Sequence, residues 1–246
     1  VLWALRTGGR LGRREIAEIT NLSFPTVCRV TAELIKDSLI IEVDSVNVGK
    51  AKRKTALLDV NPDGGWVAAL DVGANHLRAA AMDFSGTTRE TVEMPVESLQ
   101  GEELVTPAVR SALETLIKKA KRLKGSPRAI GVSAPGTVDS EQGIIRLNFN
   151  LQLRDFPIAR IVREICDVPT AVYNDAASAS LAEAKLGAGR ENTDFAYIAV
   201  RSGVGAGLVF GGQVRALLPD AEFGLMVVAP EGDPERFGGR GYLESL

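Results

Sequence analysis

The sequence predicts a mixed α/β protein with two parts, a small, largely helical head and a larger body of alternating strands and helices. Three observations predict this fold class. Two helical patterns around a short turn precede a hairpin pattern with a basic tip, within residues 13–60. Three adjacent strand-like runs from residue 66 then lead into helices and strands in alternation. Near residue 200, glycines recur at alternate positions after an apolar run, a pattern that permits close backbone approach.

The composition limits the classes of protein to which the chain can belong. Its net charge is −2, but residues 1–62 carry 10 Lys and Arg against 7 Asp and Glu, while the remainder carries 19 against 24. A basic head on an acidic body is compatible with nucleic acid binding by the head. The two cysteines, Cys28 and Cys166, form no disulfide framework, which fits a reducing cytoplasm. No apolar run approaches the roughly 18 residues of a membrane span. Because the chain starts at Val1 and stops in mid-pattern at Leu246, we expect a fragment.

The head is predicted to be a winged helix-turn-helix domain over residues 1–62. Asn21 suits the left-handed conformation of the turn, and Ser23 suits the N-cap of the second helix, with Pro25 in its first turn. A hairpin follows around a basic loop, residues 49–54. The expected elements are helices over 13–20 and 24–35 and strands over 39–43 and 55–60.

The start of the second helix and the basic loop are the candidate DNA contacts. The helix start carries small polar side chains beside an arginine, which suits base reading in the major groove. The loop side chains would contact phosphates or the minor groove. Alone, such a basic run is more often a solvated loop, and only its place beside the capped helix favours DNA. The candidates are Ser23, Phe24, Thr26 and Arg29 in the helix and Lys52, Arg53 and Lys54 in the loop.

The body, residues 63–246, follows a short linker. Strands are expected over 66–71, 77–83, 87–94, 129–133, 170–173 and 195–200, and helices over 102–124, 157–166 and 176–186. Three adjacent strands, then helix, strand, helix and strand, match the half-domain of the actin-like and sugar-kinase ATPases. The sequence therefore predicts a complete first lobe of this fold and a partial second lobe that begins near residue 192.

Two glycine-containing turns are candidate phosphate sites. One follows the first strand of the body, and the other follows the strand that ends at Val200. Glycine lets backbone N–H groups approach an anion because no Cβ stands in the way. Each pattern alone is more often only a turn. The residues assigned to phosphate or nucleotide binding are Asp71, Gly73, Asn75, Gly203 and Gly205.

Four segments resemble motifs of the ROK family of sugar-responsive repressors and sugar kinases. Residues 69–78 resemble its first phosphate motif, with Asn75 in place of the usual threonine, and residues 131–139 resemble its sugar-side loop. Residues 150–158 are similar to its asparagine-bearing sugar loop, with Leu153 in place of tryptophan, and residues 174–177 match its catalytic-aspartate segment. The head matches the repressor branch. The resemblance implies sugar contacts from Asn150, Asp175, Glu222 and Glu244.

The zinc motif of that family is degenerate in this chain. By resemblance, the ligand positions are Leu225, Glu235, Phe237 and Tyr242. A structural zinc site needs four nitrogen or sulfur ligands, and only Glu235 could coordinate a metal at all. We therefore expect no metal and no cofactor. The single histidine, His76, is expected to be a surface residue.

These features favour a cytoplasmic transcriptional regulator, a repressor of sugar metabolism genes. It would bind duplex operator DNA through the head and a sugar or sugar-phosphate effector in the body, and it would act as a homodimer or higher homo-oligomer. One alternative is an ATP-dependent sugar kinase with an accessory head, in which Asp175 is the general base and ATP and Mg²⁺ are bound. The other is a regulator that has lost its effector.

Overall fold

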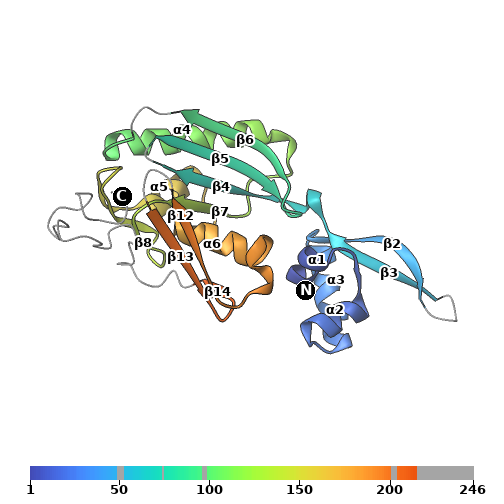
Figure 1. The fold of residues 1–246 in the computed structure, drawn as a ribbon. Helices are drawn as coiled ribbons and strands as arrows, with labels where there is room; N and C mark the ends of the chain where they lie inside the picture. The colour runs from blue at the N-terminus through green and yellow to red at the C-terminus, as the bar shows by residue number, and fades with distance from the viewer. Residues whose placement is uncertain (49–52, 74, 96–98, 201–203, 215–246) are drawn as a thin grey trace. The chain divides into compact units, whose positions relative to one another are not determined.

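The computed structural model describes residues 1–48, 53–73, 75–95, 99–200 and 204–214. The chain divides into two compact units (Figure 1). The first comprises Val1–Ala68, Ala80–Thr91 and Leu116–Ala129, and the second comprises Ala69–Ala79, Val92–Thr115 and Ile130–Leu246. The boundary that we placed at residue 62 stays a prediction, because the first unit also takes in two later segments.

The head has the predicted order of elements. Its elements are α1 (Leu2–Gly8), β1 (Leu11–Gly12), α2 (Arg13–Thr20), α3 (Phe24–Lys36), β2 (Ile40–Val48) and β3 (Arg53–Val60). The strands form an antiparallel sheet in the order β1-β3-β2. The helix over 13–20 is confirmed. The sequence did not predict α1 or the short strand β1, and the hairpin strands are longer than expected.

The core of the head draws one apolar side chain from each main element. Leu5, Ile16, Val27, Ile40 and Leu58 are almost fully buried, one each from α1, α2, α3, β2 and β3. Burying a side chain of this size contributes about 1.5–3 kcal/mol. Phe84, from the turn after β5 (His76–Asp83), also packs against this cluster. The three helices are thereby fixed to the hairpin, and the outer surface of α3 is left free for contacts.

The body is built on a five-stranded sheet in the order β11-β7-β4-β5-β6. Its strands are β4 (Trp66–Val72), β5, β6 (Thr88–Pro95), β7 (Ile130–Ala134) and β11 (Thr170–Asn174). A smaller antiparallel sheet has the order β10-β9-β8, with β8 (Thr137–Asp139), β9 (Ile144–Asn148) and β10 (Leu153–Phe156). Every strand predicted for the first lobe is present. The three short strands between residues 137 and 156 were not predicted.

The helices of the body are α4 (Glu102–Lys119), α5 (Ile158–Ile165) and α6 (Asp175–Leu186). The helix predicted to reach residue 124 ends at Lys119, where a 3₁₀ turn over Ala120–Arg122 replaces it. A third antiparallel sheet, β12 (Phe195–Val200), β13 (Val204–Phe210) and β14 (Gln213–Val214), lies beside α6 (Figure 1). Within the described residues, no helix is both long enough and apolar enough to cross a membrane.

Candidate functional site

The start of α3 is held by two hydroxyl groups. Ser23 is the N-cap, and its Oγ accepts a hydrogen bond of 3.3 Å from the Thr26 backbone N–H. The two side-chain hydroxyls lie 2.8 Å apart. Asn21, in the turn before this helix, has φ 55°, the left-handed conformation that we predicted. Ser23 and Thr26 therefore fix the start of the helix. If they also contact DNA, their hydroxyl groups must do so in addition to these hydrogen bonds.

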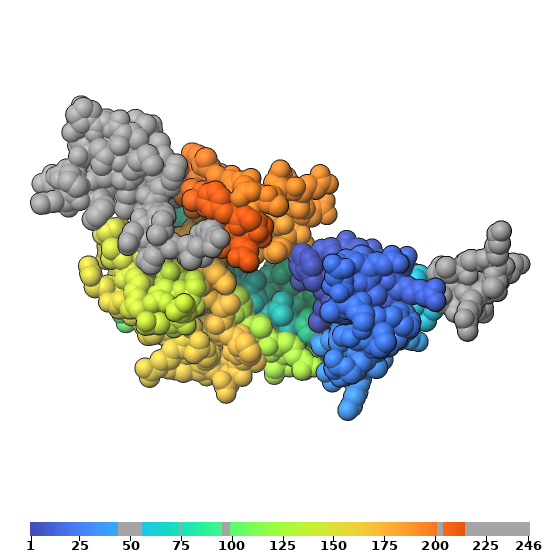
Figure 2. Space-filling model, turned by 90° about the horizontal axis from the view of Figure 1, so that it is seen from below, coloured from blue at the N-terminus to red at the C-terminus, as the bar shows by residue number. Residues whose placement is uncertain are grey.

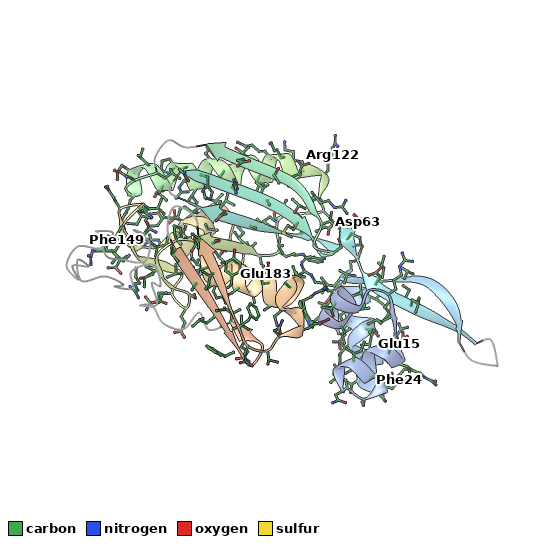
Figure 3. The ribbon with its side chains drawn as sticks, in the orientation of Figure 1. Glu15, Phe24, Asp63, Arg122, Phe149 and Glu183 are labelled. Carbon is green, nitrogen blue, oxygen red and sulfur yellow. The ribbon has the colours of Figure 1, made fainter. Side chains whose placement is uncertain are left out.

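The exposed face of α3 carries an aromatic ring and an ion pair. Phe24 is 48% exposed, and Figure 3 labels it on the helices of the head. Arg29 Nη1 lies 3.1 Å from Glu33 Oε1, one helical turn further on, and both side chains are exposed. Figure 2 shows the helical surface of the head in blue. Phe24 and Arg29 are thus exposed, and their role in base reading stays a prediction.

The basic loop is shorter than expected. Arg53 and Lys54 belong to β3, where they pair with Val48 and Asn47 of β2, so they are strand residues rather than loop residues. Lys52 lies outside the described residues. A contact that the sequence did not suggest joins Arg13 to Glu42 at 2.7 Å and to the Thr31 hydroxyl at 3.1 Å. It ties the start of α2 to α3 and to the hairpin.

Three of the predicted ligand segments of the body lie where strands of the five-stranded sheet end. Backbone bonds from Arg128 N to Trp66 O and from Ala68 N to Ala129 O show that β4 and β7 run in the same direction. Strands β7 and β11 are also parallel. The carboxyl ends of all three strands therefore lie at the same edge, the usual position of a ligand site in an open α/β sheet. Asp71 is the second-last residue of β4, a loop follows β7 at Ala134, and Asp175 follows the end of β11.

Asn174 connects two of these segments. Its Oδ1 accepts from the backbone N–H groups of Ala176 (2.9 Å) and Ala177 (3.2 Å), and its Nδ2 donates to the Gly136 carbonyl at 2.9 Å. Asn174 caps α6, and Asp175 is the first residue of this helix rather than its N-cap. The half-buried Asp175 carboxylate therefore stands in the first turn of α6 next to the loop after β7.

The asparagine-bearing loop lies between β9 and β10. Asn150 is exposed at this turn, whereas Asn148 is buried and accepts from the Leu151 N–H at 2.6 Å. The sequence analysis missed Asn148. The sequence alone did not indicate a structural role for this residue, because that role is the hydrogen bond by which it closes the turn. The buried asparagine fixes the loop, and Asn150 is left free for a ligand.

An ion-pair cluster supports the same small sheet. Arg146 contacts Asp139 at 2.6 Å and Asp155 at 3.0 Å. A hydrogen bond from the Gln142 N–H, together with the Arg146 guanidinium, holds the pKa of Asp139 below its ordinary value. The same carboxylates raise the pKa of Arg146. The two ion pairs link β9 to β8 and to β10 within the small sheet.

The alternate glycines after β12 lie in a strand rather than in a turn. Gly205 and Gly207 belong to β13, where they pair with Ala199 and Tyr197 of β12. A Cβ on Gly207 would overlap the carbonyl oxygen of Ala176 in α6 and would lie 2.6 Å from Ser180 Oγ. These glycines therefore allow β13 and α6 to pack closely, and placing Gly205 and Gly207 in a turn was wrong, whereas residues 201–203 of the predicted turn lie outside the described residues. Phosphate binding by Gly205 stays a prediction.

The turn between β4 and β5 gathers the other predicted phosphate residues. His76 Nε2 lies 3.1 Å from Asp71 Oδ2, and Nδ1 lies 3.3 Å from Asn75 Oδ1. His76, expected to be a surface residue, has a side chain that is 28% exposed and lies over Gly73. Gly203, Glu222, Glu244 and the four zinc-motif positions lie outside the described residues. Among the described residues, no three His, Cys, Asp or Glu side chains are grouped to hold a metal ion.

Together, the sheets and the helices packed on them form an α/β body of the actin-like ATPase and sugar-kinase type, and the head has the order of elements of a helix-turn-helix. The ROK family model matches residues 67–245 of this chain. The chain belongs to the ROK family.

Known members of the family include both repressors and kinases. The xylose repressor of Caldicellulosiruptor bescii is 27% identical over 208 residues, 83% of this chain and 51% of that protein. A crystal structure of a ROK family transcriptional regulator, a homologue of the E. coli MLC protein, matches with TM-score 0.80 and 21% identity over 99% of this chain and 62% of its own. A ROK family glucokinase from Streptomyces griseus, in complex with glucose and AMPPNP, matches with TM-score 0.63 and 25% identity over 74% and 56%. The chain spans about half the length of the curated relatives it matches.

Proposed function

We propose that this protein is a DNA-binding transcriptional regulator, a repressor of sugar metabolism genes controlled by a sugar or sugar phosphate. The observation that carries the proposal is the capped helix α3, whose exposed face presents Phe24 and Arg29 beside a hairpin with basic residues. The same chain joins this head to a ROK body. The match to a ROK regulator over 99% of this chain, head included, supports the proposal.

In this function the second helix reads bases and the hairpin contacts the backbone. Arginine can bind guanine with two hydrogen bonds, and an aromatic ring can pack on the thymine methyl group. Ser23 and Thr26 lie on the same helix start, beside Phe24 and Arg29. Lys52, Arg53 and Lys54 add sequence-independent contacts to phosphates.

The effector would bind at the carboxyl edge of the sheet. Asn150 and Asp175, with Glu222 and Glu244, are the polar groups that we assign to sugar hydroxyls, because carboxylates and amides accept hydroxyl hydrogen bonds well. A ligand that prefers one arrangement of the protein shifts the population toward it. Two heads on a palindromic site require at least a homodimer. We place the protein in the cytoplasm, where it would meet its operator.

The test is a binding assay with operator fragments and a panel of sugars and sugar phosphates. Fluorescence anisotropy should show at least tenfold tighter binding to one fragment than to its scrambled version, and one sugar should change that affinity. Asp175→Asn should abolish the change caused by the sugar and leave ligand-free DNA binding intact. Equal affinity for all DNA would exclude the proposal.

A sugar kinase is the second candidate, because the half-buried Asp175 directly follows the carboxyl end of β11. As general base, it would take the hydroxyl proton during phosphoryl transfer. Sugar-dependent release of ADP, abolished by Asp175→Asn, would support this alternative. Absence of ADP release with every sugar of the panel would reject it.

We also propose that the protein holds no structural zinc. Leu225, Phe237 and Tyr242 have no side chain able to bind zinc, which leaves Glu235 as one ligand where four are needed. Metal analysis of protein purified without a histidine tag should find well under one equivalent of zinc, and EDTA should leave the melting temperature unchanged. A stoichiometric zinc would contradict this proposal.

A further inference from the structure

We infer that the turn between β4 and β5 does not accept a magnesium nucleotide, because the side chain of His76 closes it. Resemblance to the kinases assigns this turn to nucleotide phosphates, so the residues present can be tested against that ligand. They do not fit it. Nothing in the inference depends on DNA or sugar binding, and it can fail or hold independently of the proposed function.

The carboxylate of Asp71 is already engaged. Its Oδ2 lies 3.1 Å from Nε2 of His76, whose other ring nitrogen lies 3.3 Å from the Asn75 side-chain oxygen. A carboxylate at this place would be needed to organise Mg²⁺ together with phosphate oxygens. The imidazole instead occupies that oxygen, and a metal would have to displace the ring first.

The backbone at Gly73 is covered as well. A Cβ on Gly73 would lie 2.6 Å from Nε2 of His76 and would overlap its Cε1, so the ring is packed directly on the glycine. Glycine in a phosphate turn is useful because its bare Cα leaves the anion room to approach. Here the imidazole fills that room. The Gly73 N–H is also used, since it donates to the His76 carbonyl at 2.9 Å.

The closure is made by a side chain that can be removed. His76 is 28% exposed and Asp71 is 41% exposed, so the ring forms the outer wall of the turn rather than part of a deep core. Truncation to alanine would expose Gly73 and free the Asp71 carboxylate. The same strand offers a matched control in Arg78, which is exposed and pairs with Glu93 at 2.9 Å away from the turn.

The experiment compares the parent, His76→Ala and Arg78→Ala with AMPPNP and Mg²⁺ by isothermal titration calorimetry. Parent and Arg78→Ala should show no saturable binding below about 1 mM, and His76→Ala should bind at least tenfold more tightly. Saturable submillimolar binding by the parent would overturn the inference. Equal behaviour of parent and His76→Ala would overturn it too.

A second measurement reads the closed turn directly. The chain contains one histidine, so its imidazole NMR signals need no assignment. Asp71→Asn should shift these signals, Arg78→Ala should leave them in place, and AMPPNP with Mg²⁺ should not move them in the parent. If the imidazole chemical shifts are the same in Asp71→Asn and the parent, the ring does not contact Asp71 and does not close the turn.

Discussion

At the residue scale, Asn174 shows how one side chain can organise a site. Its amide oxygen accepts two N–H groups at the start of α6, and its amide nitrogen donates to the loop after β7. Because Asn and Asp are about equally good N-caps, residue type alone does not decide between Asn174 and Asp175. The choice depends on the Gly136 carbonyl, which only Asn can satisfy with a donor. That carbonyl is 38 residues away in the chain and gave no local signal.

We predict that Asn174→Ala lowers the free energy of unfolding by about 1–2 kcal/mol, through loss of the cap and of the bond to Gly136. Asn174→Asp is the matched variant, since it keeps the capping oxygen and loses only the donor. Urea denaturation should place the aspartate variant between the parent and the alanine variant. An aspartate variant as unstable as the alanine variant would show that the cap contributes nothing.

Asp83 is a buried carboxylate whose ionisation stabilises the fold. Burial raises its pKa, but hydrogen bonds from the Ser85 hydroxyl, the Arg89 guanidinium and the Thr87 N–H outweigh this and hold the pKa below its ordinary value. Because the folded-state pKa is depressed, the stabilisation is complete above the unfolded value of about 3.9 and is lost as pH falls through the folded-state value.

We predict that the urea midpoint of the parent falls as pH drops below about 4 and that Asp83→Asn reduces this fall. Above that pH the variant should be less stable than the parent by a constant amount. Arg78→Ala, which removes an exposed charge, serves as control and should keep the slope of the parent. If the urea midpoint of Asp83→Asn falls with pH as steeply as that of the parent, other carboxylates cause the acid sensitivity.

At the scale of elements, α6 and β13 show where sequence patterns mislead. Alternate glycines after an apolar strand predicted a phosphate turn, yet Gly205 and Gly207 continue in a strand. The reason is the close approach of Ala176 and Ser180, a contact between segments about 30 residues apart that no local pattern reveals. By contrast, α2 and α3 were predicted well, since caps, turn and apolar periodicity are all local.

We predict that Gly207→Ala destabilises the body by about 1–3 kcal/mol, because the new Cβ would push the carbonyl of Ala176 away. Gly131 in β7 is the matched control, since a Cβ there meets nothing within 4 Å. Gly131→Ala should therefore have a melting temperature close to that of the parent. Equal melting temperatures for both alanine variants would mean that β13 and α6 pack less closely than described.

At the scale of the whole molecule, the uneven charge shapes how the protein can meet DNA. Residues 1–62 carry a net charge of +3 and the rest carries −5, so only the head should attract a polyanion. The fold class followed from the order of strands and helices. The contact of the His76 ring with Gly73 could not be predicted, because no sequence pattern shows on which side of the turn a side chain packs.

The last prediction separates base reading from charge. Arg29→Ala and Arg53→Ala each remove one cation from the head, one on α3 and one on the hairpin. Because Arg29 is exposed on the face that we assign to the major groove, its loss should weaken binding to the cognate operator by about 1–3 kcal/mol and to random DNA much less. Loss of Arg53 or Lys52 should weaken both similarly and reduce the salt slope by about 1.

Anisotropy titrations at several salt concentrations, with operator and scrambled fragments, measure both quantities at once. The comparison is matched because each substitution changes the net charge of the head by the same amount, so a purely electrostatic head would respond to all three alike. In that outcome Arg29 would have no base-reading role, and specificity would have to come from Phe24 and its neighbours. A loss of specificity confined to Arg29→Ala would assign base reading to α3. The three substitutions remove the same charge, and only Arg29 lies on that helix.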